Sequence, residues 1–275
     1  MSDHQHPQDH HDHAGSQTAH HHHDQASGFA EANKEHFNAS AALSHFDEPQ
    51  TIEMARRVAA AFKRQYDFDE ETTTVLDFAC GNGASAYPSY VIANKMIASG
   101  LISRELAGVC KSIVGVDISQ ALVDNYNERV SNQGISPDEM RAVCIELKGE
   151  VNELDGHKFD VVVCSAAYHH IENVDGITKA LSFHLKPGGV LLVADFLDLE
   201  ETNRDGGSSS TTTSSGSLFP DGYQHIVAHM KGFKSDDLRK LFEGAGLTFS
   251  IDIVTRAKLH GKDFTVFVAR GQKPT

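Results

Sequence analysis

Apolar and polar positions alternate along the chain in a pattern that predicts repeated strand–helix units from about residue 50 onward. Short runs rich in Val, Ile and Leu are typical of strands that are covered on both faces. We expect such strands at Thr74–Phe78, Ser112–Asp117, Met140–Leu147, Phe159–Ser165 and Val190–Phe196, with two more near Leu247–Val254 and Asp263–Ala269. Apolar residues at helical spacing predict intervening helices that include Gln120–Val130, Gly176–Leu185 and Ser235–Gly244.

The order of these elements predicts one α/β domain over residues 31–275, with a doubly wound, mostly parallel sheet and an antiparallel C-terminal addition. A short helix is expected from about Ala30, and a firmer one over Pro49–Arg64, where the apolar residues form one stripe. The sequence Lys186-Pro187-Gly188-Gly189 predicts a sharp turn before the fifth strand. Ser235 is the expected N-cap of the last helix.

Two segments break this rhythm. Residues 205–217 consist mainly of Gly, Ser and Thr, which predicts a flexible loop. The connection from Gly83 to Asp117 spans 34 residues, although one helix with its turns needs only roughly 15–20. Removing the 17 residues Ala84–Gly100 would join Gly83 to Leu101 at a natural helix start. We interpret this stretch as a lineage-specific insertion or a translated intron, and the transcript sequence distinguishes the two.

The first 30 residues hold nine of the 18 histidines and almost no apolar side chain. Such a segment buries too little surface to fold alone, so residues 1–30 are expected to form a disordered tail. Neutral imidazoles bind zinc, nickel and copper. We therefore expect weak divalent metal binding by this tail, without assigning it a metal-dependent function.

Composition excludes several classes of protein. A net charge of -14 disfavours a nucleic acid partner, because duplex binding rests on neutralising phosphates with Lys and Arg. No apolar run is long enough to span a membrane, and the start of the chain lacks the features of a secretory signal. Four well-separated cysteines fit buried thiols in a cytoplasmic protein better than a disulfide framework.

The candidate chemistry lies at two strand ends. The strand that contains Asp77 runs into a small-residue turn with Gly81 and Gly83, where a ligand can lie against bare backbone. The next strand ends in Asp117, whose carboxylate can accept hydrogen bonds from the two hydroxyls of a ribose. Taken alone, Asp117 could equally serve as an N-cap of the following helix. Together the two strand ends indicate a nucleoside-containing cofactor at the carboxyl ends of a parallel sheet.

The sequence Asp-Phe-Ala-Cys-Gly-Asn-Gly at 77–83 resembles the first motif of the class I S-adenosylmethionine-dependent methyltransferases. The nearest likeness is to the branch of the ubiquinone and menaquinone biosynthesis methyltransferases and their secondary-metabolite relatives. Four further matches follow in the family's order: Val-Gly-Val-Asp-Ile-Ser at 114–119, the run at 159–171, Leu-Lys-Pro-Gly-Gly-Val-Leu-Leu at 185–192, and the run at 232–247. The likeness covers about residues 33–270.

This resemblance implies a Rossmann-like fold, S-adenosylmethionine as cofactor and a small organic methyl acceptor. Asp117 becomes the ribose acceptor, and Glu146 and Leu147 become candidates for contacts with the adenine amine and ring. Ala79 stands where the family often has another glycine. The full set of implied cofactor-binding residues is Asp77, Ala79, Cys80, Gly81, Gly83, Asp117, Ile118, Glu146, Leu147, Cys164 and Ser165.

Histidines supply the candidate catalytic residues. His169 and His170 follow the fourth strand, at the expected mouth of the site, where one of them can act as general base or orient the acceptor. His225 and His229 lie four residues apart on one helical face. Without a recognisable third ligand we interpret them as a pocket wall rather than a metal site, with His229 a further catalytic candidate.

Two alternatives to a small-molecule methyltransferase remain at this stage. One is a catalytically inactive protein that keeps the cofactor fold and binds metal through its tail. The other is an NAD-dependent reductase, because Ala86 at the third glycine position is permitted in the dinucleotide fingerprint. The helix near Asn33–Phe37, together with residues 200–222, is a candidate lid over the acceptor.

Overall fold

A computed structural model describes residues 23–40, 49–81, 101–198, 217–219, 222–259 and 262–275. The predicted insertion at 84–100 and nearly all of the predicted loop at 205–217 lie outside these residues, as do residues 1–22 of the predicted tail. The last part of that tail is helical, because the first helix begins at His23. None of the described helices combines the length and the apolar character that crossing a membrane requires.

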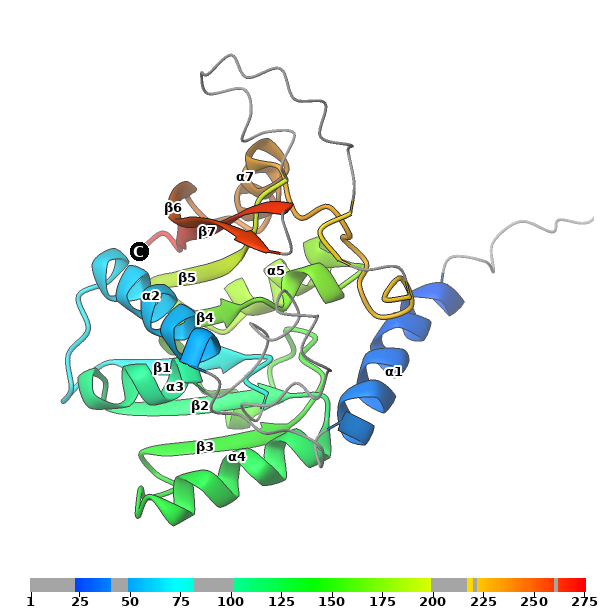
Figure 1. Ribbon diagram of the computed structural model, residues 1–275. Helices are drawn as coiled ribbons and strands as arrows, with labels where there is room; N and C mark the ends of the chain where they lie inside the picture. Colours follow the sequence, from blue (N-terminus) through cyan, green and yellow to red (C-terminus); the bar gives the residue numbers. More distant parts are fainter. Residues whose placement is uncertain (1–22, 41–48, 82–100, 199–216, 220–221, 260–261) are drawn as a thin grey trace, which may run out of the picture.

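The centre of the molecule is a seven-stranded sheet in the order β3-β2-β1-β4-β5-β7-β6 (Figure 1). Its strands are β1 (Thr74–Phe78), β2 (Ser112–Asp117), β3 (Met140–Cys144), β4 (Phe159–Ser165), β5 (Leu185–Phe196), β6 (Ser250–Leu259) and β7 (Lys262–Gln272). The first five pair in parallel, and β7 runs antiparallel between β5 and β6. The predicted doubly wound sheet with an antiparallel C-terminal addition is therefore confirmed.

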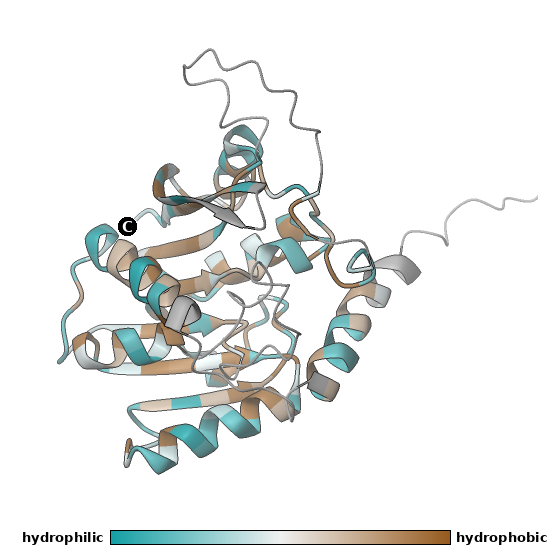
Figure 2. Ribbon diagram, in the orientation of Figure 1, coloured by the Kyte–Doolittle hydropathy of each residue, from teal (hydrophilic) through white to brown (hydrophobic). Residues whose placement is uncertain are grey.

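Helices cover both faces of the sheet. The helices are α1 (His23–Ser40), α2 (Pro49–Gln65), α3 (Leu101–Leu106), α4 (Gln120–Asn132), α5 (Val174–Phe183) and α7 (Ser235–Gly244), with 3-10 turns η3 (Ala107–Val109), η4 (Glu153–Gly156) and η5 (Tyr168–His170). One buried cluster joins the sheet to α2, α3 and α4, and a second joins its other face to α5 and α7. Figure 2 shows the matching pattern, with apolar strands at the centre and polar outer faces on the helices.

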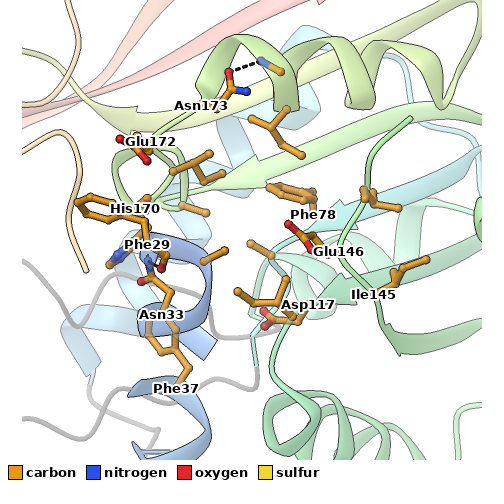
Figure 3. Close-up of a pocket in the computed structure, with 18 of the residues that line it drawn as sticks. Phe29, Asn33, Phe37, Phe78, Asp117, Ile145, Glu146, His170, Glu172 and Asn173 are labelled. Carbon is orange, nitrogen blue, oxygen red and sulfur yellow. Dashed lines mark hydrogen bonds between the residues drawn. The ribbon is translucent and has the colours of Figure 1, made fainter. Parts of the chain in front are cut away.

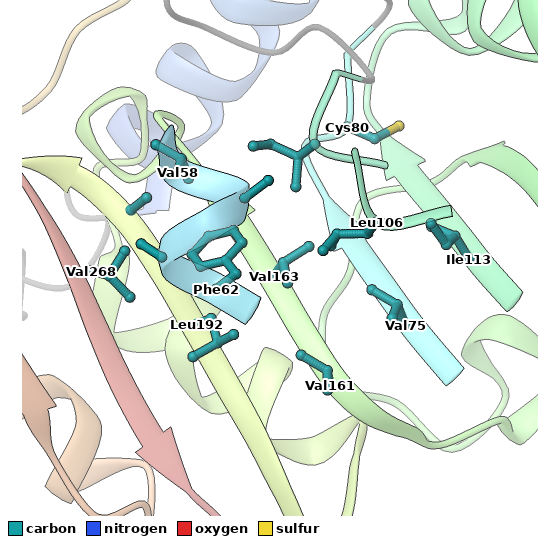
Figure 4. Close-up of a cluster of buried hydrophobic side chains, with 14 of the residues drawn as sticks. Val58, Phe62, Val75, Cys80, Leu106, Ile113, Val161, Val163, Leu192 and Val268 are labelled. Carbon is teal, nitrogen blue, oxygen red and sulfur yellow. The ribbon is translucent and has the colours of Figure 1, made fainter. Parts of the chain in front are cut away.

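Phe62 of α2 illustrates how the first face is held. Its side chain is fully buried and packs in the cluster that also contains Val163 of β4, Leu192 of β5 and Val268 of β7 (Figure 4). Complete burial of a phenylalanine side chain contributes about 1.5–3 kcal/mol relative to an exposed one. Because α2 contacts β5 as well as β6 and β7, it joins the parallel part of the sheet to its antiparallel addition.

Several element ends differ from the prediction. Strand β5 begins at Leu185 rather than Val190, because Leu185 already pairs with Phe159 and the Pro-Gly-Gly residues loop out before pairing resumes. Strand β3 ends at Cys144 rather than Leu147, so that the next residues leave the sheet. Strands β6 and β7 extend to residues 259 and 262 because they pair with each other as a hairpin. The N-cap of α7 is Lys234, with no side-chain capping bond, rather than Ser235.

Gly115 in the middle of β2 is required by packing. A Cβ atom there would lie 2.7 Å from Sγ of Cys80 and 3.3 Å from Cβ of Ala142. We expect Gly115→Ala to lower the free energy of unfolding by about 1–3 kcal/mol, as overpacking of a filled core does. Gly108→Ala is the matched control, because its Cβ would meet nothing within 4 Å. Urea unfolding of both variants tests this, and equal stabilities would contradict it.

Candidate functional site

A cavity of about 560 Å³ lies at the carboxyl ends of β1, β2 and β4, against α1. It is lined by Phe29, Ala30, Asn33, Phe37, Phe78, Ala79, Asp117, Ile118, Leu122, Ile145, Glu146, Leu147, Lys148, Ala167, His170, Ile171, Glu172, Asn173, Gly176 and Ile177. Figure 3 shows two groups of side chains: residues of α1 and η5 on one side, and Phe78, Ile145 and Glu146 on the other. Apolar walls with a few polar groups are typical of a small-molecule site.

The turn after β1 has an unusual backbone. Ala79 has a φ of 55° and Gly81 a φ of 57°, both in the left-handed region. Glycine adopts this conformation freely, whereas a residue with a Cβ atom loses roughly 1–2 kcal/mol there. The position at which Ala79 replaces the family's glycine is therefore one that favours glycine, and the turn stays in place because neighbouring contacts hold it.

Asp117 supplies those contacts at the end of β2. Its Oδ2 accepts a hydrogen bond from the backbone N–H of Gly81 at 2.9 Å, and its Oδ1 accepts one from the N–H of Ser119 at 3.0 Å. Burial raises the pKa of the carboxyl group to about 6, although these hydrogen bonds favour the charged form. A carboxylate offers about four acceptor sites, so Asp117 retains capacity for further donors in the cavity that it lines.

Asp77 lies beneath the turn and is not among the lining residues. Its side chain is buried and accepts a hydrogen bond from the hydroxyl of Ser103, near the start of α3. Burial raises the pKa of Asp77 to about 7, and the nearby charge of Asp117 acts in the same direction. Ser103 was not a predicted site residue; the only sequence signal was the helix start expected at Leu101.

His170 reaches the cavity from η5. Its side chain is buried, and its Nδ1 lies 2.7 Å from the carbonyl oxygen of Ile226. Because a carbonyl can only accept, Nδ1 carries the proton and Nε2 holds a lone pair; that Nε2 has no hydrogen-bond partner. Burial holds the pKa of His170 well below its usual value, and His169 contributes in the same direction. The imidazole is therefore neutral.

The other predicted histidines lie outside the cavity lining. His169 is fully buried, with Nδ1 2.9 Å from Oδ1 of Asp195 and its ring stacked on Phe219. His229 is partly buried and donates through Nε2 to the carbonyl oxygen of Ile171 at 2.9 Å. His225 is exposed and bonds the carbonyl oxygen of Gly222. Within the ranges that the structure describes, no cluster of three His, Cys, Asp or Glu side chains is arranged to hold a metal ion.

The remaining predicted residues divide into two groups. Ala79, Ile118, Glu146 and Leu147 line the cavity with Asp117. Cys80, Gly81, Cys164 and Ser165 are not lining residues: the first three are buried, and burial raises the pKa of both thiols well above the usual value. Gly83 lies outside the described residues.

Helix α1 supplies a wall that the sequence indicated only as a candidate lid. Phe29, Asn33 and Phe37 line the cavity, and they recur at the i, i+4, i+8 spacing that places side chains on one face of a helix. Apolar and polar residues are only weakly separated between the faces of α1, so this short apolar face was not a strong signal. The helix is held by Asn38, whose Oδ1 accepts from Oγ of Ser119 at 2.7 Å and from the N–H of Ala121 at 3.3 Å.

Comparisons with known proteins identify the family. A family model described as "Methyltransferase domain" matches residues 50–250. An uncharacterized methyltransferase of Schizosaccharomyces pombe is 36% identical over 67% of this chain and 56% of its own length. The chain belongs to the class I S-adenosylmethionine-dependent methyltransferases. The ubiquinone biosynthesis O-methyltransferase of Rickettsia conorii is 24% identical over 59% of this chain and 48% of its own length. The chain thus spans about half the length of these relatives.

A solved structure agrees with the fold of this methyltransferase. A putative methyltransferase of Haloferax volcanii, solved in complex with the Trm112 activator, matches 87% of this chain and 98% of its own, at 16% identity and a TM-score of 0.56. Family membership makes S-adenosylmethionine the cofactor of the methyltransferase, as the sequence predicted. The comparisons give no support to the alternative of an inactive protein with a metal-binding tail.

The buried carboxyl of Asp77 generates a test of stability. A folded-state pKa of about 7 means that folded protein retains a proton which the unfolded chain loses near pH 4. The protonated carboxyl of Asp77 therefore makes its full contribution to the free energy of unfolding below pH 4, and this contribution is lost as the pH rises through 7. Between pH 6 and 8 the cofactor-free protein should lose roughly 1.4 kcal/mol of unfolding free energy through this group.

Asp77→Asn should remove that part of the pH dependence, because an amide stays neutral and its oxygen can still accept from Ser103. Asp124→Asn, which changes an exposed carboxylate, is the matched control. Urea unfolding at pH 6 and pH 8 measures the difference. A slope for Asp77→Asn equal to that of the control would show that Asp77 is already ionised in the folded protein.

Proposed function

We propose that this methyltransferase transfers the methyl group of S-adenosylmethionine to a small organic acceptor held in the cavity at the carboxyl ends of β1, β2 and β4. The observation that carries the proposal is the arrangement of that cavity. Carboxylates of Asp117 and Glu146 lie toward β2 and β3, whereas His170 and the apolar face of α1 lie on the other side. A volume of about 560 Å³ is within the range of small-molecule sites.

The residues around Asp117 fit the cofactor chemically. A ribose presents two hydroxyl donors, and Asp117 presents a buried carboxylate with acceptor capacity to spare. We assign the ribose to Asp117 and the exocyclic amine of adenine to Glu146, with Ile118 and Leu147 against the faces of the ring. Ala79 and the turn at 80–83 would border the methionine part, supported from beneath by Asp77, Cys164 and Ser165.

The chemistry needs few protein groups. The bound cofactor supplies a methyl group that its sulfonium already activates. The chain has to position the acceptor against that group and exclude water, and such positioning lowers a barrier by up to about 7–11 kcal/mol. When the acceptor is a hydroxyl, its proton leaves as the bond to the methyl carbon forms, and it passes to a base of the site or to solvent. We assign the exclusion of water to α1. It contacts the η5 turn through the rings of Phe37 and His170, whose centroids are 5.6 Å apart, and it contacts the start of α4 through Asn38.

A small acceptor is favoured over a nucleic acid. A net charge of -14 repels phosphates, and the relatives named for ubiquinone biosynthesis are O-methyltransferases. We therefore favour oxygen as the methylated atom and retain carbon, nitrogen and sulfur as alternatives. His169 and His229 are proposed to support the site from outside the cavity, through Asp195 and the carbonyl of Ile171.

Asp117 provides the direct test of the cofactor assignment. We expect Asp117→Asn to weaken binding of S-adenosylhomocysteine on the order of 100-fold, because charge-assisted hydrogen bonds contribute about 1.5–3 kcal/mol each. Glu172→Gln is the matched control, since Glu172 lines the same cavity on the side of α1. Calorimetric titration measures both affinities. If Asp117→Asn binds as the wild type does while the protein remains folded, the ribose does not lie at Asp117.

Asn38 tests the role of α1 as a cover. Asn38→Ala removes both hydrogen bonds to the start of α4, so backbone amides of α1 should exchange several-fold faster and S-adenosylhomocysteine should protect them less. Lys34→Ala is the control on the same helix, because it removes only a surface ion pair with Glu31. Hydrogen exchange followed by mass spectrometry gives the rates. Identical exchange in the two variants would mean that Asn38 does not hold α1 in place.

A further inference from the structure

Two buried polar atoms of the cavity have no hydrogen-bond partner: Nε2 of His170 and Oδ1 of Asn33. The two residues line the same side of the cavity (Figure 3). They are in contact, because Nδ2 of Asn33 donates to the backbone carbonyl of His170 at 3.4 Å. Their relative exposures are 8% and 4%, so bulk water does not satisfy either atom. A buried polar group without a partner costs about 1–3 kcal/mol, which a ligand can relieve.

The neighbouring contacts decide which kind of atom each group presents. Nδ2 of Asn33 faces the carbonyl oxygens of Phe29 and His170, so the amide must point its Oδ1 the other way. Nδ1 of His170 donates to the carbonyl oxygen of Ile226, so Nε2 carries only a lone pair. Both free atoms are therefore acceptors, and the hydrogen-bond partners of each side chain prevent it from turning into a donor.

We propose that Asn33 and His170 form the binding subsite of the methyl acceptor. They select an uncharged, largely apolar molecule with one hydrogen-bond donor, either the O–H of a hydroxyl or the N–H of an amine. Anionic ligands are disfavoured, since a carboxylate or phenolate would place lone pairs against lone pairs beside the carboxylate of Glu172. Phe29, Phe37 and Ile171 supply the apolar surface for the rest of the molecule. This inference rests on the proposed function, because the subsite is placed in the cofactor cavity.

The burial of His170 defines its role further. A buried imidazole loses hydration of its charged form and is therefore a weak base, in agreement with the lowered pKa of His170. His170 therefore accepts a hydrogen bond from the bound molecule at Nε2, which is unprotonated in the resting site, and fixes the orientation of the donor-bearing atom. Asn33 is the second positioning group. Because Asn33 belongs to α1, the same helix covers the cavity and supplies a group that binds the acceptor.

The test uses phenol and toluene, which have nearly the same shape. Phenol carries a hydroxyl group where toluene carries a methyl group. Ligand-observed NMR measures their binding to the full-length protein loaded with S-adenosylhomocysteine. We expect the wild type to prefer phenol on the order of 10-fold, although toluene is the more hydrophobic probe. Benzoate, which has the same ring and an anionic group, should bind more weakly than phenol.

Two substitutions separate the acceptor role from a structural one. His170→Asn retains an N–H that can donate to Ile226 and removes Nε2, so the preference for phenol should disappear while the melting temperature and affinity for S-adenosylhomocysteine change little. His170→Gln reaches the position of Nε2 with an amide oxygen and gives up the bond to Ile226, so it should retain part of the preference. The opposite pattern would assign His170 to holding Ile226 and would overturn the proposal.

Failure of this inference is distinguishable from failure of the proposed function. If the wild type binds S-adenosylhomocysteine but does not distinguish phenol from toluene, the cofactor site stands and the subsite is wrong. If S-adenosylhomocysteine does not bind at all, the proposed function fails first. A preference for phenol that persists in both His170 variants but is lost in Asn33→Leu would remove His170 from the subsite.

Discussion

The arrangement of the site depends on the hydrogen bond between the backbone N–H of Gly81 and Oδ2 of Asp117. This bond joins the turn after β1 to the end of β2, and the same carboxylate holds the start of α4 through Ser119. It also helps to maintain the left-handed backbone of the turn, including Ala79, which lacks the freedom of glycine. A buried carboxylate thus has a structural role and still keeps acceptor capacity toward the cavity.

The second constraint is the position of α1. Its contacts with the start of α4 and with η5 place it at the carboxyl ends of the strands, where it forms one wall of the cavity. Asp117 is therefore connected to α1 indirectly: it accepts from the N–H of Ser119, and the hydroxyl of Ser119 donates to Asn38 of α1. Cofactor binding and acceptor binding would be linked through this chain of hydrogen bonds.

Much of the fold followed from the sequence because buried parallel strands carry a strong local signal. The strands that contain Asp77, Asp117 and Cys164 were predicted with their observed bounds. Ends that depend on pairing were predicted less well. Leu185 joins β5 because Phe159 lies beside it, and β6 extends because β7 does, which are relations between residues far apart in the chain.

By itself the sequence determined the fold class, the family and the cofactor, because ordered motifs and apolar periodicity are local properties. It also indicated five residues that line the cavity with His170. Tertiary structure alone decided that His169 pairs with Asp195 away from the cavity. It alone also decided that Nε2 of His170 and Oδ1 of Asn33, both from residues that line the cavity, are unsatisfied acceptors. The reason is physical: burial and the partners of each polar atom are set by packing among distant segments.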